Sequence, residues 1–223
     1  LVMLAKTRGI VFRYTKYGET SIIVTIFTEL YGLQTYIVNG VRSKSTKSKI
    51  ALYQPLTLLE LVVYHKENAN ILRLKEVKCF YPYHTLTRDI RKSAIALFIN
   101  EVLNKAVKEQ SHAEELGAYI IQSMMVLDQT EHPENFHLQF LVGLSKFLGF
   151  QPQNAAEVIG GRLLDAEEEE LLNEVIASRP GSQLSLTYLQ RKNLLDMLLR
   201  FYATHIENMG EFKSQVVLRE VLG

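Results

Sequence analysis

The pattern of hydrophobic and polar positions divides the chain into a strand-like first part and a helix-like second part. Up to about residue 80, short segments rich in β-branched and aromatic residues alternate with turn residues, which is typical of β-strands. The second of these segments is an almost continuous apolar run, which indicates a strand covered on both faces. The expected strands lie at residues 7–14, 21–27, 33–38, 56–64 and 71–80.

Five strands with no long helix between them fit a small closed barrel. The OB-fold is the commonest five-stranded version, and an SH3-like barrel is the alternative that periodicity does not separate from it. We predict a five-stranded OB-fold β-barrel over residues 1–80, which would be a nucleic-acid-binding domain.

From residue 84 onward the apolar positions recur at helical spacing, so we predict an α-helical domain over residues 81–223 and an α+β multidomain chain. Acidic residues after Asp165 and the hydroxyl of Thr187 are typical helix starts. Residues 151–162 fit neither pattern clearly. The expected helices are residues 93–107, residues 114–127, a helix from Pro133 to Phe147 or Leu148 that Gly149 stops, one starting at Asp165, one starting at Thr187, and residues 212–222.

Charge is unevenly placed, although the net charge of the 223 residues is only +1. Residues 1–80 hold 12 Lys and Arg against 5 Asp and Glu, and the remaining residues hold 13 against 19. Such asymmetry indicates a polyanionic partner for the basic part.

The basic segment at residues 39–49 places four cations and no acid among small hydroxyl residues, between two expected strands. A mobile cationic loop on a β-domain is suited to binding phosphates, and a solvated surface loop is the alternative. Aromatic residues of the same domain could stack on bases, although each single tyrosine is better explained by core packing. We expect Arg42, Lys44, Lys47 and Lys49 to form the rim of a nucleic-acid groove, and Arg13, Lys16, Arg8 and Lys6 to line its floor or edge.

The sequence contains few motifs that would indicate a catalytic or metal site. The chain has no phosphate-binding loop, dinucleotide fingerprint, zinc-protease motif or nucleophile elbow, so we expect no catalytic residues. His132 and His137 are five residues apart, which does not bring both rings to one helical face, so we expect no metal. Cys79 is the only cysteine and no apolar run reaches the ~18 residues of a membrane span, so we expect a reduced cytoplasmic setting.

Five segments, in order, resemble the RecO family of bacterial recombination mediators. Residues 17–28 look like the second-strand signature of that family, and residues 39–42 with the lysines that follow are similar to its basic linker. Residues 53–61 resemble its fourth strand, and residues 98–103 its first long helix. Residues 136–152 are similar to the helix and turn that precede its zinc module.

The resemblance implies an OB-fold followed by a helical domain, binding of single- and double-stranded DNA, and annealing of complementary strands. It also implies contacts with RecR and with the C-terminal tail of single-stranded DNA-binding protein, loading of the RecA recombinase at gaps, and a bacterial, nucleoid-associated location. Some members hold zinc with four cysteines. Here the corresponding region, at about residues 151–164, contains none, so the zinc module is absent or metal-free.

Overall fold

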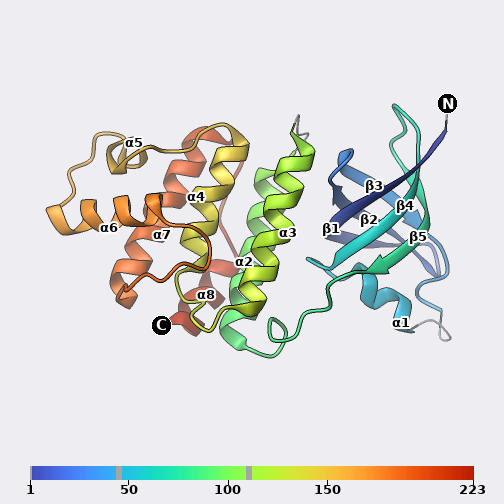
Figure 1. Ribbon diagram of the computed structural model, residues 1–223, viewed down its shortest axis with the longest axis horizontal. Coiled ribbons are helices and arrows are strands. Elements are labelled where there is room, and N and C mark those ends of the chain that lie inside the picture. The colour runs from blue at the N-terminus through green and yellow to red at the C-terminus, as the bar shows by residue number, and fades with distance from the viewer. Residues whose placement is uncertain (1, 44–46, 109–111) are drawn as a thin grey trace. The chain divides into compact units, whose positions relative to one another are not determined.

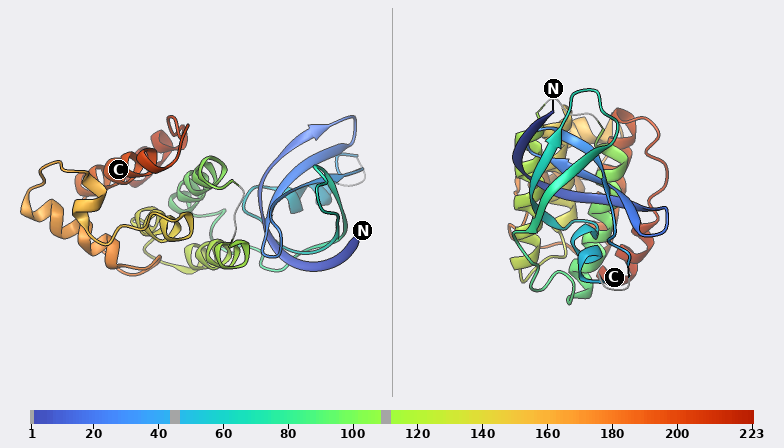
Figure 2. Two further views of the ribbon diagram at one scale, coloured as in Figure 1. Left: turned by 90° about the horizontal axis from the view of Figure 1, so that it is seen from above. Right: turned by 90° about the vertical axis from the view of Figure 1, so that its right-hand side faces the viewer.

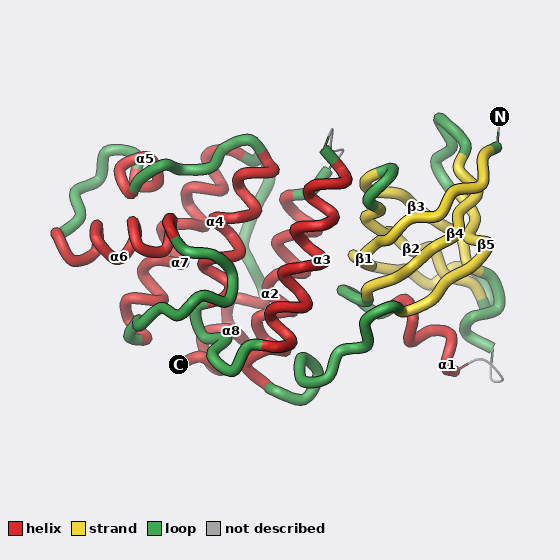
Figure 3. The backbone as a smooth tube through the Cα atoms, in the orientation of Figure 1, coloured by secondary structure: helices red, strands yellow, loops and turns green. Residues whose placement is uncertain are grey.

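The computed structural model describes residues 2–43, 47–108 and 112–223, and for Lys47 and Ser48 it describes only the backbone. The chain divides into two compact units. The first comprises residues 1–82 and 108–122, and the second comprises residues 83–107 and 123–223. Figure 3 shows that the strands lie in the first unit and most of the helices in the second. The division into domains at residues 1–80 and 81–223 stays a prediction.

Five strands form a closed barrel in the order β1-β2-β3-β5-β4 (Figure 1). All neighbouring pairs are antiparallel except β3 and β5, which are parallel. This closure is the OB-fold arrangement, which removes the SH3-like alternative and confirms the predicted barrel. The strands are β1 (Met3–Tyr17), β2 (Ser21–Thr28), β3 (Gly32–Val38), β4 (Leu58–His65) and β5 (Leu72–Cys79).

Strand β1 is longer than the sequence predicted and pairs with two neighbours. Its first half pairs with β4, and its second half pairs with β2. The register shifts between Val11 and Arg13, which marks a β-bulge that bends the strand. Gly9 lies two residues before this shift, and a Cβ added to it would meet the Cγ2 of Ile26 at 2.8 Å. A long strand can therefore close the barrel because it bends there and approaches β2 closely; Figure 2 shows the curved strands enclosing the interior.

The barrel interior is filled by alternate positions of each strand. From β2 these are Ile22, Val24 and Ile26, all of them fully buried. Phe27 is also fully buried but faces outward, where it stacks on Phe12 with ring centroids 5.8 Å apart. Burial of these residues on opposite faces agrees with the apolar run that predicted a strand covered on both sides.

The connection from β3 to β4 contains short helices that the sequence did not reveal: α1 (Lys47–Ile50) and the 3-10 helix η2 (Ala51–Tyr53). Val41 at its start is 2% exposed and Tyr53 near its end is 4% exposed, and both belong to the barrel core. Buried side chains at Val41 and Tyr53 thus hold the two ends of this connection. The expected mobility of the basic loop falls largely on residues 44–46, which lie outside the described residues.

The second unit is built from helices, with the first part of α3 grouping instead with the barrel. Asp165 and Thr187 cap helices α6 and α7 as predicted, and Gly149 ends α4 with φ of 90°. Pro133 lies in the turn before α4 and is not its first residue, because its carbonyl accepts a hydrogen bond from the amide of Phe136. The helices are α2 (Ile90–Ala106), α3 (Ala113–Gln129), α4 (Phe136–Leu148), α5 (Ala155–Ile159), α6 (Ala166–Ala177), α7 (Tyr188–His205) and α8 (Ser214–Leu222).

Buried polar groups hold the helical unit at defined points. The Asp128 carboxylate, 1% exposed, accepts hydrogen bonds from the backbone amides of His84, Thr85 and Leu86. The Lys92 ammonium, 4% exposed, donates to the Asp128 carbonyl at 2.7 Å. Because these groups are out of water, each depends on its partners, and together they fix the segment that leads into α2.

Candidate nucleic-acid interface

Arg42 is fixed to the turn between β1 and β2. Its Nε donates to the carbonyl of Ser21 at 3.0 Å, and its Nη2 donates to the carbonyl of Gly18 at 2.5 Å. Its backbone amide donates to the carbonyl of Thr20 at 3.0 Å. These bonds use the fork geometry of the guanidinium to hold the turn, so Arg42 is an ordered part of the rim rather than a mobile one.

Neighbours of Arg42 explain why it reaches that turn. Val41 is buried in the barrel core, which directs the chain across the end of the barrel. The hydroxyl of Ser21 donates to the side-chain oxygen of Asn39 at 2.9 Å, which adds a second link between the two segments. Gly18 has φ of 56°, a left-handed conformation that glycine adopts without strain. The turn and the start of the basic segment are therefore built as one feature.

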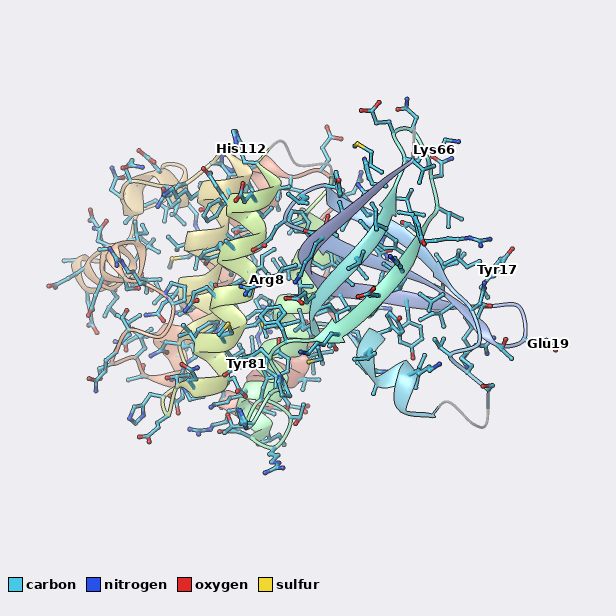
Figure 4. All side chains as sticks on the ribbon, turned by 45° about the vertical axis from the view of Figure 1, so that its right-hand side comes forward. Arg8, Tyr17, Glu19, Lys66, Tyr81 and His112 are labelled. Carbon is cyan, nitrogen blue, oxygen red and sulfur yellow. The ribbon has the colours of Figure 1, made fainter. Side chains whose placement is uncertain are left out.

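Arg13 and Lys16 lie on the part of β1 that leads into the same turn, and both are exposed. Arg13 pairs with Thr25 and Lys16 pairs with Ile22. Since Ile22 faces the interior, Lys16 projects from the mouth of the barrel, whereas Arg13 is on the outer face. We call Arg13, Lys16 and Arg42 the hairpin-end surface; Figure 4 shows Tyr17 and Glu19 at its tip.

The structure describes the other three rim cations, Lys44, Lys47 and Lys49, to different extents. Lys49 is exposed on α1, in the same connection as Arg42. Lys47 begins α1, and its side chain lies outside the described part of the structure. Lys44 lies outside the described residues altogether. The structure therefore describes the side chains of Arg42 and Lys49 among the four rim residues that the sequence suggested.

Lys6 and Arg8 do not join the hairpin-end surface. They lie on the half of β1 that pairs with β4, where the Lys6 ammonium forms an ion pair with Glu60 at 3.1 Å. The Arg8 guanidinium lies over the ring of Phe80, 4.7 Å from its centroid. Figure 4 shows Arg8 far from the turn that Tyr17 marks. The hydrophobic pattern of the sequence does not indicate the bulge and the bend that separate the two halves of β1.

Carboxylates surround Lys6 and Arg8. A surface hollow there is lined by both cations and by Glu29, Glu60 and Glu114. Burial raises the pKa of the Glu29 carboxyl, Arg8 opposes that shift and Glu114 adds to it. By contrast, residues 9–28 contain one acid, Glu19. The hairpin stretch therefore supplies one acid, whereas three carboxylates line the hollow at Lys6 and Arg8.

The aromatic residues of the barrel mostly serve its packing. Phe12, Tyr36 and Tyr53 are buried, and Tyr14 and Tyr31 pack against the core. Tyr31 also stacks on His65, with ring centroids 3.7 Å apart. Tyr17 and Tyr64, by contrast, are exposed, at 53% and 41%. The expectation that a single tyrosine packs in a core therefore holds for most of them.

Sequence reasoning passed over the cations of β5. Arg73, Lys75 and Lys78 are exposed there, while Leu72 is buried in the barrel. The alternation of apolar and charged residues along this strand could have shown that its cations face solvent, because one face of a barrel strand points inward and the other outward. Arg73 pairs with Ile37 of β3 and Tyr64 of β4, so it lies at the junction between those strands.

The described residues contain no group of three or more histidine, cysteine, aspartate or glutamate side chains that could hold a metal ion. His137 is 1% exposed and sits edge-on to Phe98, and burial lowers the pKa of its imidazole to about 3. A neutral core histidine accounts for these contacts. Among the same described residues, no helix combines the length and apolar character that crossing a membrane requires.

The closed barrel, its basic hairpin end and the helices that follow define an OB-fold protein with an appended helical unit. Residues 3–83 match the sequence model described as "Recombination protein O N terminal", and residues 87–168 match "Recombination protein O C terminal". The chain belongs to the RecO family of DNA repair proteins.

Relatives support the same assignment over nearly the full length. The chain is 34% identical to the DNA repair protein RecO of Christiangramia forsetii, over 99% of this chain and 100% of the relative. It is 40% identical to the DNA repair protein RecO of Bacteroides fragilis, over 98% of this chain and 99% of the relative. A more distant relative from Thermoanaerobacter is 26% identical, over 71% of this chain and 63% of that protein.

Proposed function

We propose that this chain is a non-enzymatic DNA-binding and strand-annealing recombination mediator, which helps to load the RecA recombinase at single-stranded gaps. What supports this function most is the set of exposed cations around the turn of an OB-fold barrel, in a chain of the RecO family. OB-folds bind single strands with cationic grooves and aromatic rings.

Annealing sets specific physical requirements. Two phosphate backbones must be neutralised at once, while the base edges stay free to pair. Lys and Arg contacts to phosphate meet both requirements, because they carry no sequence information. The hairpin-end surface and Lys49 are assigned this role, with Arg42 holding the turn in place for the other cations.

Partner contacts complete the proposal. RecR and the C-terminal tail of single-stranded DNA-binding protein are the protein partners expected of a family member, with single- and double-stranded DNA as the nucleic-acid partners. The helical part of the chain is acidic overall, which makes the basic barrel the better candidate for the DNA contacts.

Annealing of two complementary oligonucleotides coated with single-stranded DNA-binding protein tests the function directly. The full chain should accelerate annealing, and the acceleration should fade as salt rises because the driving force is phosphate neutralisation. No acceleration by the folded protein, together with no shift of labelled single strands at low salt, would favour a protein-interaction scaffold whose DNA binding comes from a partner.

A further inference from the structure

We infer that Tyr64 and Arg73, on the outer face of the barrel, form a platform on which a base of single-stranded DNA stacks, distinct from the hairpin-end surface. The inference deepens the proposed DNA-binding function and rests on it. Aromatic rings on OB-folds hold single strands by stacking, which tolerates any base.

The strand register places the two side chains next to each other and facing outward. Tyr64 of β4 lies opposite Arg73 of β5. Their chain neighbours Val63 and Leu72 are buried in the barrel core, and successive side chains of a strand alternate between faces. The ring of Tyr64 and the guanidinium of Arg73 therefore project from the same outer surface.

Apolar residues extend this surface on both sides. Leu4 of β1 lies opposite Tyr64, and Ile37 of β3 pairs with Arg73, so one row crosses four strands. Tyr64 is 41% exposed and Leu4 is 52% exposed, whereas Ile37 is half-buried. Ile71, two residues before Arg73 in the chain, is 50% exposed. Single exposed apolar residues are ordinary, but Leu4 and Tyr64 are exposed directly opposite each other, which indicates a binding surface.

Charge favours a nucleic acid as the occupant. Lys75 is the extra residue where the β4–β5 register shifts, and Lys66 lies in the β4–β5 hairpin, as Figure 4 shows. With Arg73 these cations outnumber the nearby acids Glu67 and Glu76. A ring beside a guanidinium offers one base a stacking face and its phosphate a positive charge.

The platform also fixes the position of the DNA strand on the protein, which phosphate contacts alone do not do. Cations alone hold the backbone and leave the bases unrestrained, whereas one stacked base fixes where the strand lies on the protein. A single ring holds one base and leaves its neighbours free to pair. Stacking of this kind is expected to contribute little to the salt dependence of binding, because no counterion is released by it.

The test compares Tyr64→Leu, which keeps an apolar side chain without a ring, with Tyr64→Phe, which keeps the ring. The full chain is titrated into a labelled oligothymidylate and into an abasic strand of equal length, and anisotropy gives the dissociation constants. Tyr64→Leu should bind oligothymidylate about tenfold more weakly with an unchanged salt slope, and Tyr64→Phe should bind as the wild type does. None of the variants should change binding to the abasic strand.

Tyr188 provides the matched control, since it is 43% exposed on α7, and Tyr188→Leu should leave both dissociation constants unchanged. If Tyr64→Leu and the wild type bind oligothymidylate with equal affinity, the platform is overturned and the exposed row is better explained as a contact for a protein partner. If both proteins still bind in a salt-dependent way, the proposed DNA-binding function is kept. A wild-type chain that binds neither strand would overturn both.

Discussion

Replacing Arg42 with lysine separates its structural role from its charge. Lysine keeps the positive charge but cannot donate from two fixed nitrogen atoms to the carbonyls of Ser21 and Gly18. A hydrogen bond from a charged group contributes roughly 1.5–3 kcal/mol when well buried. Arg42 is only half-buried, so we assign about 1 kcal/mol to each bond and about 2 kcal/mol to the pair.

A loss of about 2 kcal/mol corresponds to roughly a 30-fold larger population of the open turn. Hydrogen exchange at the amide of residue 42, which bonds to the Thr20 carbonyl, should therefore accelerate by about that factor in Arg42→Lys. The amide of Glu29, which bonds to the Arg8 carbonyl, is the internal control and should keep its rate. Single-strand affinity should fall as well, although the net charge is unchanged.

Wild-type exchange at residue 42 in Arg42→Lys would refute the anchoring account. Wild-type DNA affinity in a variant with fast exchange would show that the cations act without an ordered turn. Arg42→Ala provides the comparison, because it removes both the bonds and the charge and should bind DNA more weakly than Arg42→Lys.

Three further predictions concern stability. The pKa of His137 is lowered to about 3 by burial, so the unfolded chain takes up a proton first as pH falls below about 6.5. The wild type should lose about 2 kcal/mol of unfolding free energy between pH 7 and pH 5 relative to His137→Phe, and equal pH profiles in urea titrations would contradict this. Gly9→Ala should destabilise the chain by about 1–3 kcal/mol, because its Cβ would meet the Cγ2 of Ile26 at 2.8 Å; an unchanged denaturation midpoint would count against that packing. Asp128→Asn should cost about 2–4 kcal/mol in the same assay, since the amide NH2 that replaces Oδ2 cannot accept from the backbone amide of His84 and the bonds to Oδ1 lose the carboxylate charge; a loss below about 1 kcal/mol would show that the amides find other partners.

Elements with a strong local signal were predictable from the sequence. The apolar run of β2 and the start residues Asp165 and Thr187 each carry their information within a few residues, because strand burial and helix capping are local. The additional length of β1 was missed, since its first residues alternate without a strong β-branched signature. α1 was missed because its four residues, Lys47–Ile50, lie in a segment dominated by serine and lysine.

The candidate site was less predictable than the fold. Sequence composition identified the basic domain, but it could not show that Arg8 and Arg13 lie on opposite sides of a bend in β1. Arg42 looked like a free cation because the carbonyls that bind it come from a turn more than 20 residues earlier. Arg73 became a candidate only when the parallel pairing of β3 and β5 placed it beside Ile37. Each miss concerns a contact that depends on tertiary structure.

The salt dependence of single-strand binding tests the central claim most directly. The wild type is compared with the triple variant of Arg13, Lys16 and Lys49 to alanine, and with Lys6→Ala/Arg8→Ala as the control in which the other cations of β1 are removed. Each phosphate contact contributes about 0.7 to the slope of log affinity against log salt for single strands.

The triple variant should therefore bind single-stranded DNA more weakly and lose about 2 from the magnitude of that slope, while the control keeps a slope near the wild-type value. A triple variant with the wild-type affinity and slope, or a control that loses as much as the triple variant, would contradict the assignment of DNA binding to the hairpin end of the barrel.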